Sequence, residues 1–140
     1  MRIVAADWLP YCLPLRRPWQ TSRGTLTERR GRLRRLITDD GRTGWGDCAP
    51  LPEFGIDEAA ATAFAEESAT LDLAAQAAGL PLNAWLSGRL PLASVAVNAS
   101  FGPISTVDRN SLDQAAAAGF IVAKLKVGIA PVDDEIAALH

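Results

Sequence analysis

Lys124 and Lys126 are the only two lysines in the chain, and a single residue separates them. They lie in an apolar segment, FIVAKLKV, residues 120–127, whose branched side chains are typical of a strand. Residues two positions apart in a strand point to the same face, so both ammonium groups are expected to share a face with Val122. Desolvation and repulsion between like charges both favour a neutral amine, which can accept a proton near neutral pH. The pair therefore predicts acid/base chemistry.

The other face of the same segment would be wholly apolar, as in a strand that packs beneath a layer of helices; it comprises Ile121, Ala123, Leu125 and Val127. The alternative is an exposed strand with two solvated lysines, which is the ordinary meaning of a Lys-x-Lys pattern. The residues alone leave both interpretations open.

Other kinds of chemistry are poorly supported. The single histidine is the last residue, His140, so Ser-His-Asp and Cys-His mechanisms are disfavoured. Cys12 and Cys48 lie far apart without a Cys-x-x-Cys pattern, which indicates reduced thiols and not a zinc site or a disulfide framework. A net charge of −2 gives no electrostatic reason to expect nucleic acid or an anionic membrane as partner.

The length and composition are those of one ordinary globular domain. It has 140 residues, of which 49% are hydrophobic, enough to form a core. No apolar run reaches the roughly 18–20 residues that a membrane span needs. The first residues also lack the pattern of a signal peptide, so we expect a cytoplasmic protein.

The segments around the two lysines predict alternating strands and helices. We expect a buried strand at residues 93–99, a helix at 108–118 closed by Gly119, the strand at 120–127 and a helix that starts at Pro131. This order is typical of a parallel sheet with right-handed crossovers. Two parallel strands cannot cover both of their faces, so the segment resembles the start of a β/α barrel. Uncovered strands would favour association into a homo-oligomer.

The first half predicts a three-stranded antiparallel meander. The expected strands cover residues 2–9, 32–38 and 42–48, with a polar loop over 19–31 between the first two. Asp39-Asp40-Gly41 predicts the turn between the second and third strands. Gly44 and Gly46 are interpreted as strand glycines near a bulge, because no helix or third glycine completes a dinucleotide-binding pattern.

Helices are expected after this meander. Asp57 is a candidate N-cap for an Ala-rich helix that ends before Gly79, and residues 82–86 predict a helical turn that ends near Gly88. The expected apolar stripe of the long helix comprises Phe64, Leu71, Ala74, Ala75 and Ala78.

Two further groups of residues carry weaker signals. The arginine-rich run from Arg29 to Arg35 could bind phosphate, but alternation on a half-exposed strand favours a solvated face. Several loop residues could cover a pocket or simply belong to ordinary loops: Ser22, Arg23, Leu51, Glu53 and Phe54.

Taken together, four segments resemble the enolase superfamily, specifically its muconate-lactonizing subgroup, and most closely its o-succinylbenzoate synthases and dipeptide epimerases. They are GWGDCAPLPEFG at 44–55, LDLAAQAAGLPLNAWLSG at 71–88, VAVNAS at 95–100 and GFIVAKLKVG at 119–128. The resemblance implies an α+β capping domain at residues 1–90, followed by the first βα units of a TIM-type barrel at 91–140.

The resemblance also implies a reaction. In such enzymes Lys126 would be the acid/base at a carbon next to a carboxylate, and Lys124 would tune it. A small carboxylate substrate would contact the cap loops and barrel through Ser22, Arg23, Leu51, Phe54 and Asn98. Mg²⁺ would be the cofactor, but its three carboxylate ligands lie on later barrel strands that this sequence lacks.

The implied activity is that of an o-succinylbenzoate synthase, with proton abstraction followed by loss of water in a menaquinone-type pathway. The alternatives are a dipeptide epimerase or muconate cycloisomerase-like enzyme of the same superfamily, or a truncated cap module without catalysis. The chain alone is expected to be inactive.

Overall fold

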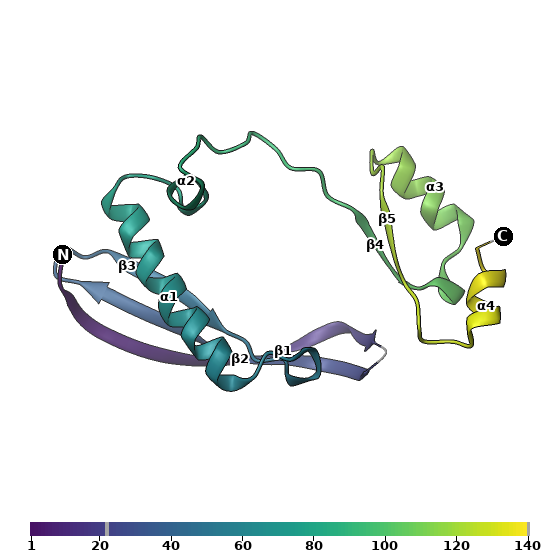
Figure 1. The fold of residues 1–140 in the computed structure, drawn as a ribbon, viewed down its shortest axis with the longest axis horizontal. Coiled ribbons are helices and arrows are strands. Elements are labelled where there is room, and N and C mark those ends of the chain that lie inside the picture. The colour runs from purple at the N-terminus through teal and green to yellow at the C-terminus, as the bar shows by residue number, and fades with distance from the viewer. Residues whose placement is uncertain (22, 140) are drawn as a thin grey trace. The chain divides into compact units, whose positions relative to one another are not determined.

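The computed structural model describes residues 1–21 and 23–139, and its chain divides into two compact units. The first unit comprises residues 1–16 and 28–92. The second comprises residues 17–27 and those from 93 onward. Figure 1 shows the elements of each unit along the chain.

An antiparallel meander in the order β1-β2-β3 is formed by Ile3–Thr21, Gly24–Thr38 and Thr43–Cys48, and residues 17–27 of its first two strands belong to the second unit. The predicted meander is therefore confirmed. Between β2 and β3 the register is unbroken from Arg32↔Cys48 to Ile37↔Thr43. The predicted turn forms at residues 39–41, where Gly41 has a φ of +85°.

The predicted polar loop over residues 19–31 is wrong, because β1 continues to Thr21 and β2 begins at Gly24. Each segment supplies the backbone partners of the other, so polar side chains do not prevent strand formation. β1 contains three prolines, and as an edge strand of the sheet it can accommodate residues that lack an N–H group.

One long helix, α1 (Glu58–Ala77), packs on the sheet against β3. It begins as predicted, because the Asp57 carboxylate accepts a hydrogen bond from the Ala60 N–H at 2.8 Å. Gly79 follows its end with a φ of +68°. The short 3-10 turn η1 (Pro52–Phe54) precedes α1, and the predicted helical turn is α2 (Leu82–Ser87), which Gly88 terminates.

The buried side of α1 differs from the predicted stripe. Phe64 is 63% exposed, whereas the buried positions follow a four-residue spacing at Ala61, Ala65, Ala69 and Leu73. This stripe packs against Leu36 and Cys48 of the sheet, and Trp8 packs against its first part. Ala75 is also buried, which agrees with the prediction, whereas Ala78 is exposed.

Gly44 and Gly46 mark the closest approach between helix and sheet, and not a bulge. A Cβ atom on Gly44 would overlap the Ala69 carbonyl oxygen, and one on Gly46 would overlap the Ala65 backbone. The continuous register of β2 and β3 confirms that no bulge is present there. Glycine on the strand and alanine on the helix together allow the two backbones to touch.

In the second unit, β4 (Ala99–Pro103) and β5 (Ala123–Lys126) form a parallel pair, as predicted. They are connected through the short turn η2 (Ile104–Thr106) and helix α3 (Arg109–Ala117), whose predicted end at Gly119 is confirmed by a φ of +92°. Helix α4 (Val132–Ala137) follows directly after Pro131.

Both strands are shorter than predicted. The expected buried strand at 93–99 is wrong: β4 begins only at Ala99, and Val95 and Val97 are 71% and 63% exposed. The pairing with β5 comprises three residue pairs, the first of them Ala99↔Ala123, so the preceding segment has no strand beside it within its described unit. The apolar face of the β5 segment is not packed either, since Ile121 is 87% exposed.

Among the described residues, no helix is long and apolar enough to cross a lipid bilayer.

Candidate functional site

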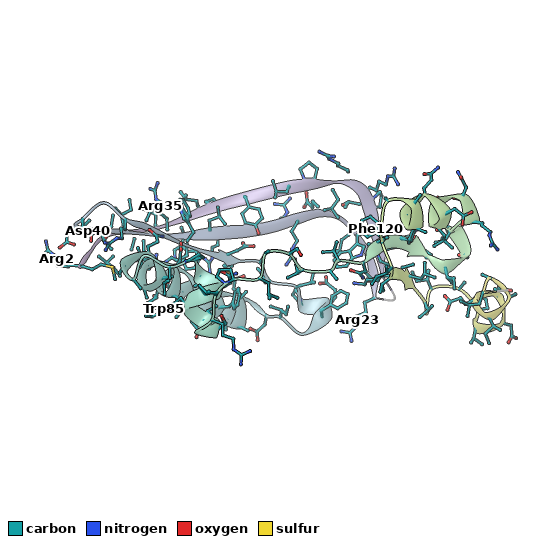
Figure 2. The ribbon with its side chains drawn as sticks, turned by 90° about the horizontal axis from the view of Figure 1, so that it is seen from above. Arg2, Arg23, Arg35, Asp40, Trp85 and Phe120 are labelled. Atoms are coloured by element: carbon teal, nitrogen blue, oxygen red, sulfur yellow. The ribbon has the colours of Figure 1, made fainter. Side chains whose placement is uncertain are left out.

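Lys126 at the end of β5 makes two contacts with the tip of the β1–β2 hairpin, which here means residues 19–21 and 23–24. Its Nζ donates a hydrogen bond to the Gln20 carbonyl oxygen at 2.7 Å, and lies 4.9 Å from the centre of the Trp19 ring. All three residues belong to the second unit. Arg23, labelled in Figure 2, marks this hairpin tip.

Lys124 lies two residues before Lys126 on the same strand, opposite Ser100 of β4. It is exposed, whereas Lys126 is half-buried. Strand geometry places both side chains on one face, as the spacing predicts. The two lysines are therefore not equivalent, because the hairpin tip contacts Lys126.

The hairpin tip is shaped by Thr21. Its hydroxyl donates to the Gly24 carbonyl at 2.9 Å and accepts from the Arg23 N–H at 3.1 Å. Arg23, a predicted substrate contact, thus lies in the same unit as the lysines. Ser22, predicted for the same role, lies outside the described residues.

Glu135 organises the loop that follows β5, and sequence reasoning missed it. Its buried carboxylate accepts hydrogen bonds from three consecutive N–H groups, those of Gly128, Ile129 and Ala130, at 2.8–3.0 Å. These bonds lower the pKa of Glu135 from its ordinary value near 4.5. Its place in the first turn of α4, seven residues beyond Gly128, was the available signal.

The predicted cap-loop residues Leu51 and Phe54 lie in the first unit. Leu51 and Ile56 form an isolated antiparallel bridge, with N–H to carbonyl distances of 2.8 and 3.2 Å, and Phe54 belongs to the 3-10 turn within it. Glu53 lies in the same turn. Asn98, in the second unit, is exposed directly before β4.

A cavity of about 360 Å³ lies beside this loop in the first unit, lined by Asp47, Ala49, Ile56, Ala60, Ala61 and Phe64. The lining is mainly apolar, and Asp47 is its only charged residue. The Asp47 carboxylate accepts a hydrogen bond from the Tyr11 hydroxyl at 2.8 Å. Burial and this bond raise the pKa of Tyr11.

Most of the arginine run makes structural contacts, so the interpretation as a solvated face holds only for Arg30, whose side chain is 73% exposed and pairs with Glu28 of the same strand. Arg32 pairs with Glu58 at 2.6 Å and Arg34 with Glu66 at 3.0 Å, both on α1. The two guanidinium groups also lie over the Trp8 ring, at 4.5 and 5.0 Å. These contacts account for both arginines, so no phosphate ligand is needed to explain their positive charges.

Arg29 and Arg35 are also held by other segments of the first unit. Arg35 pairs with Asp7 at 2.9 Å, and Arg29 donates to the Pro50 carbonyl at 2.7 Å. Arg29 thereby ties the strand β2 to the loop that contains Leu51.

The described residues do not fit a Mg²⁺ site. No group of three or more Asp, Glu, His or Cys side chains comes together among them. Glu135, the buried carboxylate beside the lysine strand, is already used by three backbone N–H groups.

Comparison with known proteins gives structural matches only, since no family model and no curated protein matches the chain. The L-Ala-D/L-Glu epimerase from Bacillus subtilis matches 99% of the chain with 20% identity and a TM-score of 0.73. The dipeptide epimerase from Enterococcus faecalis V583 matches 99% with 18% identity and a TM-score of 0.74. The chain therefore shares the fold of about half the length of each of these two epimerases.

The o-succinylbenzoate synthase from Thermosynechococcus elongatus matches 96% of the chain with 26% identity and a TM-score of 0.60. The chain spans about half the length of these proteins, between 46% and 49%. The expected fold, an α+β portion followed by parallel βα units, is confirmed by these matches.

Proposed function

We propose that this chain is the N-terminal portion of an enolase-superfamily enzyme that removes a proton from a carbon next to a carboxylate. The observation that carries the proposal is the position of Lys124 and Lys126 on one parallel strand, β5. In this proposal residues 1–90 are the capping domain, and residues 91–140 begin the catalytic β/α barrel.

Lys126 is the base in this proposal. Its amine takes the α-proton of the substrate and becomes an ammonium, which can later return a proton to the same face. Lys124 is its neighbour on the strand, and its positive charge stabilises negative charge that develops on the substrate. Arg23 and the cap loop with Leu51 and Phe54 would contribute to substrate binding, as would Ser22 and Asn98.

Mg²⁺ would supply an electrophile for the developing enediolate, but the described residues do not form a site for it. We therefore assign no step of the mechanism to a metal held by this chain. The expected result for residues 1–140 alone is no turnover.

Within this reaction class we favour loss of water after proton abstraction, as in o-succinylbenzoate synthases. The higher identity to the synthase, 26% against 18–20% for the two epimerases, supports this choice. A dipeptide epimerase is the second candidate, because the epimerases have the higher TM-scores, 0.73 and 0.74 against 0.60.

The test uses the protein that includes this chain together with the remaining barrel strands. Dipeptides such as L-Ala-L-Glu and the hydroxy-acid precursor of o-succinylbenzoate would be incubated in deuterated buffer with Mg²⁺. Proton NMR would follow exchange at the α-carbon and formation of the dehydrated product. Exchange of dipeptides would favour the epimerase, and formation of o-succinylbenzoate would favour the synthase.

Two variants separate the role of Lys126 from its charge. Lys126→Ala removes the base and Lys126→Arg keeps the charge without a group that can be deprotonated, so both should lose about 10²–10⁴-fold in kcat. Arg109→Ala, a charge removal on the exposed start of α3, is the matched control and should be near wild type. Near-normal activity of a folded Lys126→Ala variant would refute the assignment of Lys126 as the base, whereas a wild-type protein that exchanges and dehydrates none of these substrates would favour a module without catalysis.

A further inference from the structure

The hairpin tip contacts Lys126 through two groups that respond differently to its charge. The Gln20 carbonyl accepts a hydrogen bond at 2.7 Å, and the Trp19 ring centre lies 4.9 Å from Nζ. A carbonyl oxygen can accept an N–H from an ammonium or from a neutral amine. The ring face, in contrast, attracts only the cation.

The two contacts therefore depend differently on the protonation state of Lys126. The Gln20 carbonyl can hold Nζ in place in either protonation state, so it fixes the position of the side chain. Trp19 adds attraction only while Lys126 is positively charged. Trp19 is 39% exposed, so it is not one of the buried core residues.

We propose that Trp19 is a positioning residue that couples docking of the β1–β2 hairpin tip to the charge of Lys126. Coupling is reciprocal: if the docked tip favours the ammonium, then the ammonium favours the docked tip. The tip is held most firmly when Lys126 carries its extra proton, and it loosens when that proton leaves.

The consequence for catalysis rests on the proposed function. If Lys126 is the base, proton abstraction creates the ammonium, and the tip then closes more firmly over the side chain that holds the proton. Return of the proton to product weakens the cation–ring contact and favours opening. The coupling itself requires no turnover, so it can be tested separately.

The composition of the chain makes the contact directly observable. With only two lysines, lysine labelled with ¹³C at Cε gives two side-chain NMR signals, which Lys124→Arg and Lys126→Arg variants assign. The ring current of Trp19 should change the chemical shifts of the Lys126 side chain relative to those of Lys124. Trp19→Leu should remove that difference, Trp19→Phe should keep part of it, and Trp85→Leu should leave it unchanged. Trp85 is a matched control because it is 41% exposed and belongs to the first unit.

A second measurement tests the dependence on charge. 5-Fluorotryptophan gives one ¹⁹F signal for each of the four tryptophans, and a neutral paramagnetic cosolute reports the exposure of Trp19. Lys126→Met should raise the open-to-docked ratio of the tip at least two- to fivefold, the ratio that corresponds to about 0.5–1 kcal/mol for an exposed cation–ring contact. Lys126→Arg should keep Trp19 protected, and Lys124→Met should not change it.

The proposal is overturned if Trp19→Leu leaves the Lys126 signals in place, or if Lys126→Met and Lys126→Arg affect Trp19 equally. Either result would stand whether or not the complete enzyme abstracts protons. Conversely, loss of the proposed catalytic role of Lys126 would leave these NMR predictions intact.

Discussion

Gly46→Ala should separate α1 from the sheet, because the structure has no space for the added methyl group. The new Cβ would overlap three backbone atoms of Ala65, namely its carbonyl oxygen, its carbonyl carbon and its Cα. Backbone atoms in the middle of a helix cannot rotate away as a side chain can. The only relief is movement of the helix as a body, which would loosen the packing of Cys48 against Ala61 and Ala65.

The expected cost is about 3 kcal/mol, at the upper end of the range for overpacked cores. A small part is offset, because alanine in a strand is more favourable than glycine by about 0.5–1 kcal/mol. For a first unit of about 80 residues, the net loss of about 2–2.5 kcal/mol corresponds to a fall in Tm of about 8–20 °C. Thermal unfolding followed by circular dichroism, with amide exchange of α1 and β3 to locate the loss, would measure it.

Two variants make this prediction specific. Gly102→Ala in β4 places a Cβ 3.4 Å from the Thr106 hydroxyl, an ordinary contact, so its stability should stay within about 0.5 kcal/mol. Adding Ala65→Gly to Gly46→Ala should not restore stability, because the overlap involves the Ala65 backbone. A Gly46→Ala melting temperature within 3 °C of wild type, or rescue by the second change, would refute the close-approach argument.

Three further predictions concern the lysine pair, the loop after β5 and the core. In the complete enzyme, Lys124→Ala should lower kcat, because negative charge that develops on the substrate loses a neighbouring positive charge; an unchanged kcat would contradict this. The lowered pKa of Glu135 stabilises the loop above about pH 4.5 and stops doing so as pH falls through the folded value, so amide protection in this loop should fall with acid. Glu135→Gln should abolish that pH dependence. Leu73→Ala should cost about 2–5 kcal/mol in urea unfolding, whereas Leu86→Ala, at a 61% exposed position, should cost less than about 0.5.

Features that depend on neighbouring residues could be predicted from the sequence. The N-cap at Asp57 needs only the N–H groups of the next few residues, and Gly41 and Gly79 adopt positive φ for reasons set by their own turns. Strand limits were different, because a strand requires a partner. The polar segment 19–31 became strand because two such segments lie side by side, and the apolar segment 93–98 did not because β5 pairs only from Ala99 onward.

The candidate site shows the same division. The shared face of Lys124 and Lys126 follows from the two-residue period of a strand, which is local. The groups that complete the surroundings of Lys126 are not encoded nearby: the Gln20 carbonyl is 106 residues away in sequence, and any residue type could have supplied it. Backbone acceptors leave no compositional trace, so the partner of the proposed base could come only from the structure.

The ion pairs of the arginine run could have been predicted from the sequence, but only by considering β2 and α1 together. On β2, Arg32 and Arg34 lie two residues apart on one face, and on α1, Glu58 and Glu66 lie eight residues apart on one side of the helix. A helix packed on that face of the sheet necessarily brings the two sets together. Alternating charge along one strand does not distinguish a solvated surface from a set of ion pairs. The distinction depends on whether the element packed against that strand carries the opposite charges at matching intervals.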